Sequence, residues 1–135
     1  MFVLDASIAA SWFLEEAHDD RVSLAWRRVR GESAIVPSIW WYEIRNALLI
    51  AERRRRIAAG DVDRAWQQLP RMRIDIDVTP DDRAILRLAR KHSLTVYDAA
   101  YVELAGRAGC PLATLDDEMA KAAKAEDIPL IDHVA

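Results

Sequence analysis

Three aspartates that lie far apart in the 135-residue chain occupy positions where alternating strands and helices would bring them together. Asp5 directly follows the apolar run Phe2-Val3-Leu4, and Asp116 follows a second apolar run that ends at Leu115. If both runs are parallel strands, their carboxyl ends meet at one edge of the sheet, which is where open α/β sheets bind ligands. Asp98 begins the predicted helix just before the second of these strands. Together the three aspartates predict one acidic pocket.

Glu43 is the fourth candidate for this pocket. It lies in the longest predicted helix, from about Ile39 to Arg56, and it shares a stripe with the apolar residues Ile39, Ala47 and Ile50. A carboxylate on an apolar face needs a cation, a strong hydrogen-bond donor or a proton, because uncompensated burial is costly. Arg45 is two residues away along the helix and points elsewhere, so it is a poor partner for Glu43.

Each aspartate also has a simpler interpretation as a helix cap. Asp5, Asp98 and Asp116 each precede or begin a predicted helix, where a carboxylate can accept hydrogen bonds from free N–H groups. No cap and no local ion pair explains Glu43. Both interpretations stay open for each aspartate, but a convergent set of four acids favours a metal site over separate caps.

Four carboxylates in one pocket predict a specific chemistry. Like charges repel one another, so the group stays ionised only with a compensating cation. Oxygen ligands without histidine or cysteine suit Mg²⁺ or Mn²⁺. A water bound to such an ion can attack a phosphodiester, and the ion stabilises the charge that develops on the phosphate. The residues therefore favour metal-assisted phosphodiester hydrolysis.

The composition predicts one compact domain over residues 1–135, because 52% of the residues are hydrophobic and no Gly/Ser-rich or Pro-rich linker divides the chain. Cys110 is the only cysteine, which excludes an intramolecular disulfide. A net charge of −3 argues against a protein that simply coats nucleic acid. With no basic leader and no run of membrane-spanning length, we expect a cytoplasmic protein without membrane contact.

The remaining chain predicts the elements that position these acids. Strands are predicted at residues 2–4, 33–36, 71–78, 112–115 and 128–131, with helices between them. Ser38 is the expected cap of the helix that contains Glu43, and Pro80 the expected first residue of a later helix. Tyr97 and Tyr101 are expected on the buried stripe of the Asp98 helix. The alternation predicts an α/β/α sandwich with a central parallel sheet of about five short strands.

At this point the chain resembles a known family, the PIN-domain nucleases. The resemblance rests on four ordered motifs that together span the chain: Val3-Leu4-Asp5-Ala6-Ser7, Pro37-Ser38 through Glu43-Ile44-Arg45-Asn46-Ala47-Leu48, Tyr97-Asp98-Ala99-Ala100-Tyr101 and Ala113-Thr114-Leu115-Asp116. Within this family the chain is most similar to the VapC-type toxins of toxin–antitoxin pairs.

The resemblance implies an endoribonuclease that depends on Mg²⁺ or Mn²⁺ and hydrolyses RNA with a metal-activated water. Its catalytic and metal-binding residues would be Asp5, Glu43, Asp98 and Asp116. Ser7 and Thr114 would be nearby hydroxyls, Asn46 a donor that orients Glu43 or simply a surface amide, and Asp117 a supplement to Asp116 or its replacement. The implied partners are RNA, a cognate VapB-type antitoxin and a second copy of the chain in a larger toxin–antitoxin complex, with operator DNA bound only through the antitoxin.

Two other functions remain alternatives at this point. One is a housekeeping PIN ribonuclease in RNA processing, and the other is a non-catalytic protein whose acidic pocket docks basic groups of a partner. The compact length favours the toxin over the first alternative. The presence of all four carboxylates speaks against the second, because docking alone tolerates their loss.

Overall fold

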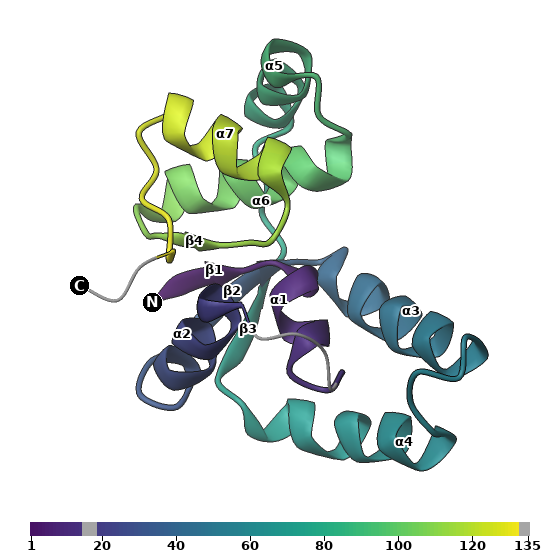
Figure 1. The fold of residues 1–135 in the computed structure, drawn as a ribbon. Coiled ribbons are helices and arrows are strands. Elements are labelled where there is room, and N and C mark those ends of the chain that lie inside the picture. Colours follow the sequence, from purple (N-terminus) through teal and green to yellow (C-terminus); the bar gives the residue numbers. More distant parts are fainter. Residues whose placement is uncertain (15–18, 133–135) are drawn as a thin grey trace.

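A parallel sheet of four short strands forms the centre of the fold in this computed structural model, which describes residues 1–14 and 19–132 (Figure 1). The strands are β1 (Phe2–Leu4), β2 (Ala34–Pro37), β3 (Ile74–Asp77) and β4 (Leu112–Ala113). Their order is β3-β2-β1-β4, and each neighbouring pair is parallel. The chain therefore builds outward from β1 to β3 and then returns to place β4 on the other side of β1.

The fifth predicted strand, at residues 128–131, is reduced to a single parallel bridge between Leu112 and Leu130. The amide of Leu112 donates to the carbonyl of Pro129, and the amide of Ile131 donates back to the carbonyl of Leu112. Pro129 has no N–H to extend this pairing, and β4 itself is only two residues long. The sandwich architecture is confirmed, with four strands in place of about five.

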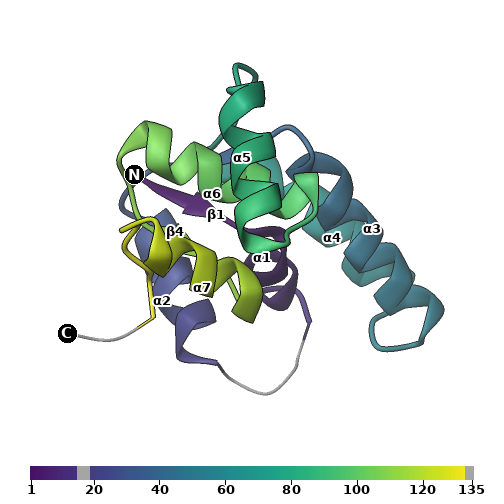
Figure 2. The same ribbon diagram turned by 90° about the horizontal axis from the view of Figure 1, so that it is seen from above.

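Helices cover both faces of the sheet, as expected for parallel strands. In the described part of the chain they are α1 (Ala6–Ser11), α2 (Asp20–Val29), α3 (Trp40–Arg53), α4 (Ala59–Gln68), a 3₁₀ turn (Leu69–Arg71), α5 (Asp82–His92), α6 (Val96–Ala108) and α7 (Asp117–Ala125). One layer contains α5, α6 and α7, and the other contains α1 to α4 (Figure 1). Viewed from above, α6 lies over β1 (Figure 2), and it also packs against β2 and β4. None of the described helices combines the length and the apolar character needed to cross a bilayer.

Three helix starts differ from the sequence prediction. Ser38 does not cap α3, which begins at Trp40 without a side-chain cap. Asp81 caps α5 by accepting a hydrogen bond from the amide of Ala84 at 3.1 Å, so the helix begins after Pro80. Thr95 caps α6, because its hydroxyl accepts from the amide of Asp98 at 3.1 Å. In each case the observed helix start lies within three residues of the predicted one.

The buried stripe of α6 begins one turn later than predicted. Tyr101 and Leu104 are fully buried, as expected, whereas the side chain of Tyr97 is 59% exposed. Residues four apart share a helix face, but a helix end can extend beyond the core that covers that face. The first turn of α6 therefore stands out from the core and carries Asp98 at its margin.

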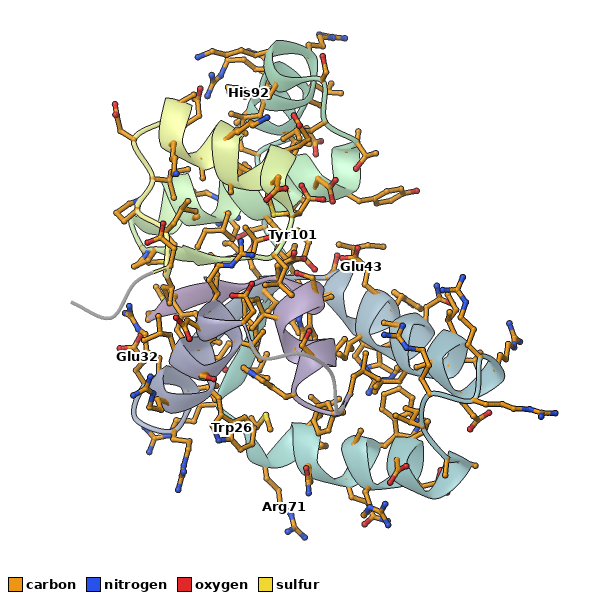
Figure 3. The ribbon with its side chains drawn as sticks, in the orientation of Figure 1. Trp26, Glu32, Glu43, Arg71, His92 and Tyr101 are labelled. Atoms are coloured by element: carbon orange, nitrogen blue, oxygen red, sulfur yellow. The ribbon has the colours of Figure 1, made fainter. Side chains whose placement is uncertain are left out.

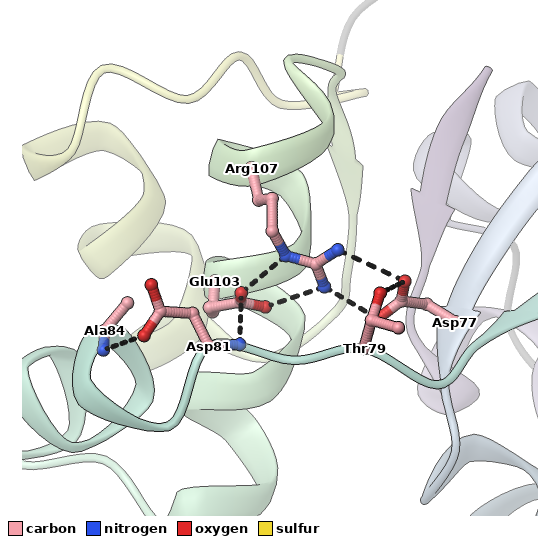
Figure 4. Close-up of polar contacts among 6 residues, drawn as sticks. All are labelled: Asp77, Thr79, Asp81, Ala84, Glu103 and Arg107. Carbon is pink, nitrogen blue, oxygen red and sulfur yellow. Dashed lines mark hydrogen bonds and ion pairs between the residues drawn. The ribbon is translucent and has the colours of Figure 1, made fainter.

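Arg107 on α6 holds the end of β3 and the start of α5 in place (Figure 4). Its guanidinium donates to Asp77 at 2.6 Å and to Glu103 at 2.7 Å. The Glu103 carboxylate, whose side chain is 2% exposed, also accepts from the backbone amide of Asp81 at 3.0 Å. Because a buried carboxylate must be compensated, this cluster fixes the distance between α6 and the β3–α5 connection.

A second ionic cluster joins α5 to α7. The Glu126 carboxylate, just after α7, accepts hydrogen bonds from Lys91 at 2.8 Å and Arg87 at 3.2 Å, and it lies 3.0 Å from Nε2 of His92, labelled in Figure 3. Hydrogen bonds from Lys91 and His92 lower the pKa of Glu126 to about 2. The ionised form of Glu126 is therefore favoured in the folded protein.

Replacing Glu103 by alanine should destabilise the fold by about 2–3 kcal/mol, because it leaves the Asp81 amide and part of the Arg107 guanidinium without an acceptor. The free energy of unfolding, measured by urea denaturation, tests this expectation. Glu118→Ala is the matched control, since its pair with Lys121 is exposed on both sides and should contribute less than about 0.5 kcal/mol. Equal effects of the two variants would contradict a structural role for the Glu103 cluster.

Glu126 should make the stability of the protein depend on pH in acid. Its pKa in the folded protein lies below the ordinary 4.5, so its contribution is complete above pH 4.5 and is lost as the pH falls through about 2. Between these values the melting temperature of Glu126→Gln should fall less steeply than that of the unmodified protein. Parallel curves for the two proteins would show that the cluster contributes nothing.

Candidate active site

Asp5 lies at the carboxyl end of β1, and its side chain is almost completely buried, with 6% of the residue exposed. Its amide donates to the carbonyl of Ala113 at 3.0 Å, which continues the pairing of β1 with β4. Its Oδ2 atom accepts hydrogen bonds from the hydroxyls of Ser7 and Thr114, both at 2.7 Å. No amide of α1 donates to this carboxylate. The capping interpretation is therefore wrong for Asp5.

The two hydroxyls that hold Asp5 also fix the turn between β4 and α7. Ser7 Oγ accepts from the amide of Leu115 at 3.2 Å, and Thr114 Oγ1 accepts from the amide of Asp116 at 3.0 Å. Each hydroxyl thus donates to Asp5 and accepts from the backbone of this turn. The network places Asp116 beside Asp5 although 111 positions separate them in the sequence.

Asp116 is a helix cap, as the simpler interpretation predicted. Its Oδ1 atom accepts from the amide of Met119 at 2.8 Å at the start of α7. Asp117 is exposed and lines a different cavity of about 290 Å³ together with Arg21 and Lys121. Of the two neighbouring aspartates, Asp116 is the one connected to Asp5 through the Thr114 hydroxyl.

Asp98 and Glu43 approach the same edge of the sheet from the two helix layers. Asp98 lies in the first turn of α6 and is partly buried. Glu43 lies in the first turn of α3, and its Oε1 atom accepts a hydrogen bond of 2.6 Å from the Tyr101 hydroxyl. Figure 3 shows the Glu43 and Tyr101 side chains in the region between α3 and α6. Tyr101 was predicted only as a core residue, although its position three residues after Asp98 places both on one face of α6.

The four carboxylates influence one another electrostatically. Burial raises the pKa of Asp5, and the charges of Asp98 and Asp116 raise it further. Burial also raises the pKa of Glu43, with added contributions from Asp5 and Asp98. The pKa of Asp98 is raised by burial and then by Asp116. Over residues 1–14 and 19–132, no lysine or arginine forms an ion pair with any of the four.

The chemistry of this donor set fits a hard divalent cation. Asp5, Glu43 and Asp116 each have one carboxylate oxygen held by a hydrogen bond, and their other oxygen accepts none from the described residues. As they stand, no three acidic, histidine or cysteine side chains in the described part of the chain are close enough to hold a metal ion together.

Asn46 does not join this group of side chains. It lies one turn after Glu43 on α3 but is exposed, and no hydrogen bond links it to Glu43 among the described residues. The interpretation of Asn46 as a surface amide agrees with this position. The donor that holds Glu43 is Tyr101 from another helix.

Comparisons with known proteins agree with this architecture. A family model described as PIN domain matches residues 2–125. Ribonuclease VapC3 of Pyrobaculum aerophilum is 30% identical over 125 residues, which cover 88% of this chain and 92% of that protein. The crystal structure of PAE2754 from Pyrobaculum aerophilum has a TM-score of 0.71 at 22% identity and covers 96% of this chain and 90% of its own.

A third similar protein is VapC20 of Mycobacterium tuberculosis, described as a toxin that cleaves the sarcin-ricin loop. Its crystal structure has a TM-score of 0.58 at 14% identity and covers 90% of this chain and 95% of its own. At such low identities the two structures support the fold alone. The family model and the 30% identical relative extend over most of the sequence. The chain therefore belongs to the PIN domain family and, within it, to the VapC-type proteins.

Proposed function

We propose that this protein is a metal-dependent endoribonuclease that acts as the toxin of a toxin–antitoxin pair. The observation that carries the proposal is the set of four mutually coupled carboxylates at the carboxyl edge of β1 and β4, for which the described residues supply no balancing cation. A buried carboxylate without such a partner is expensive to retain. The relative named Ribonuclease VapC3 supports RNA cleavage as the reaction.

In this proposal Asp5, Glu43, Asp98 and Asp116 would hold Mg²⁺ or Mn²⁺. When bound, the ion supplies an activated water and stabilises charge on the scissile phosphate. The chain's own contribution is to fix its ligands. The hydroxyls of Ser7 and Thr114 hold one oxygen of Asp5, and the cap of α7 holds one oxygen of Asp116. The ligands are thereby oriented before the ion arrives.

Asp117 has no place in the proposed metal site. It is exposed, and its charge acts on Arg21, whose guanidinium also donates to the carbonyl of Thr114 at 3.3 Å. Asp117 therefore faces Arg21 and not the other acids. Asp116 remains the ligand contributed by this turn, and Asp117 serves as a matched control for it.

We also propose a cognate VapB-type antitoxin as the partner, with a homodimer of this chain in the larger complex and operator DNA bound through the antitoxin. A cavity of about 360 Å³ lies between the starts of α3, α5 and α6, and the sequence neighbours of Glu43 and Asp98 contribute to its lining. Its lining includes Tyr42 and Tyr97, which are 66% and 59% exposed. Exposed aromatic surface beside a catalytic site suits a protein partner that covers it.

Purified protein should cleave RNA with Mg²⁺ or Mn²⁺ and lose this activity in EDTA. Asp5→Asn and Asp98→Asn should each reduce cleavage at least about 100-fold, because each removes a charged ligand of the ion. Asp117→Asn should stay within about threefold of the unmodified protein, since its side chain lies outside the acidic group. Gel analysis of a mixed RNA pool and of individual tRNA and ribosomal RNA fragments measures these rates.

Two outcomes would redirect this proposal. Cleavage that persists in EDTA, or in both variants, would contradict the metal site. Absence of both cleavage and metal binding would favour the partner-docking alternative, in which the pocket only accepts basic side chains. A genome position directly after a short antitoxin gene would distinguish the toxin from a housekeeping ribonuclease.

Asp98→Asn should leave the metal-free protein as stable as the unmodified one, or more stable, at pH 7. Burial, and then the charge of Asp116, raise the pKa of Asp98, so its charged form is disfavoured in the folded state and removing the charge removes both costs. The gain should shrink as the pH falls and Asp98 becomes protonated in both states. A lower melting temperature at pH 7 would instead assign Asp98 a structural role at the start of α6.

A further inference from the structure

The hydroxyl of Tyr101 lies at the meeting point of three helices. Tyr101 itself is on α6 and is completely buried. Its hydroxyl donates to Glu43 Oε1 on α3 at 2.6 Å, and both side chains are labelled in Figure 3. The backbone of Ala6, at the start of α1, lies near enough to the phenol to lower its pKa slightly. The Tyr101 phenol thus lies beside the residue that follows Asp5 and is hydrogen-bonded to Glu43.

Packing alone does not account for this hydroxyl. A phenylalanine would fill almost the same volume, whereas a buried hydroxyl is costly unless it is hydrogen-bonded. The phenol donates its proton to Glu43 Oε1 at 2.6 Å, so this carboxylate is the partner that satisfies the buried hydroxyl.

We propose that Tyr101 is a positioning residue of the metal site, which holds Oε1 of Glu43 and leaves Oε2 as the oxygen available to the ion. The inference rests on the proposed function, because it assigns Glu43 as a ligand. Ser7 and Thr114 hold one oxygen of Asp5 in the same manner. Tyr101 also lies three residues after Asp98 on α6, so the helix that carries Asp98 orients Glu43 as well.

The first test removes only the hydroxyl. Tyr101→Phe should weaken Mn²⁺ binding about 10- to 100-fold, which is the usual effect of losing a group that orients a metal ligand. Isothermal titration calorimetry on the otherwise intact protein measures the Kd, and circular dichroism verifies the fold. Tyr97→Phe is the matched control on the same helix, because its side chain is 59% exposed, and its Kd should change less than about twofold.

A double-mutant cycle with Glu43→Gln separates positioning from a general structural effect. If the hydroxyl acts through Glu43, Tyr101→Phe should change the Mn²⁺ affinity less than about twofold once Glu43 is replaced. An effect of the same size in both backgrounds would overturn the inference. Should Glu43→Gln abolish binding altogether, the Kd of the Tyr101→Phe single variant decides, and a value equal to that of the Tyr97→Phe control would overturn it.

The Mn²⁺ dependence of RNA cleavage is a second measurement, and it would not change if Tyr101 only stabilised the fold. In Tyr101→Phe, kcat at low Mn²⁺ should fall about tenfold, whereas the KM for RNA stays within about threefold, and saturating Mn²⁺ should restore most of the loss. A loss of kcat that saturating Mn²⁺ does not restore would contradict the role of Tyr101 in positioning Glu43. Failure of the proposed function has a different signature: Glu43→Gln would then bind Mn²⁺ as well as the unmodified protein does.

Discussion

The buried carboxylate of Asp5 is the constraint on which the rest of the site depends. A charged group that is 6% exposed needs donors, and the nearest ones come from the Ser7 and Thr114 hydroxyls. The Thr114 hydroxyl can reach Asp5 only while β4 lies next to β1, because Thr114 directly follows β4, whereas Ser7 lies two residues after Asp5 itself. The two hydroxyls also accept from the amides of Leu115 and Asp116, so the need to compensate Asp5 determines the path of the chain into α7.

The order of the strands explains why the acids gather at this edge. β1 has β2 on one side and β4 on the other, so the direction of chain progression changes between β1 and β4. At such a point the connections leave the sheet toward opposite faces and open a crevice at the strand ends. Asp5 follows β1 and Asp116 lies at the end of the turn after β4, while Glu43 and Asp98 come from the first turns of α3 and α6. The fold thus brings four separate sequence segments to one place.

The sequence was sufficient for features that follow from periodicity and order, and insufficient for those that depend on packing. Apolar runs followed by acids predicted the position of Asp5 and Asp116, because parallel strands end on a common edge. The exposure of Tyr97 was not predictable, since spacing along a helix does not reveal where the core stops. The bond from Tyr101 to Glu43 crosses 58 positions and depends on the meeting of two helices, so neither segment alone contains its signal. Pro129 shortened the fifth strand for a local reason that was visible in advance.

The acidic residues discussed above fall into two groups whose pKa values shift in opposite directions on folding. Asp77 and Glu126 have arginine or lysine donors, and their pKa values are lowered. Burial and like-charged neighbours raise the pKa values of Asp5, Glu43 and Asp98, and their hydroxyl donors offset only part of this rise. Cationic partners would stabilise the second group equally well, but they would neutralise the charge that the proposed metal ion would meet. Hydroxyl donors such as Ser7, Thr114 and Tyr101 orient a carboxylate without cancelling its charge, which is what the proposed metal site would require.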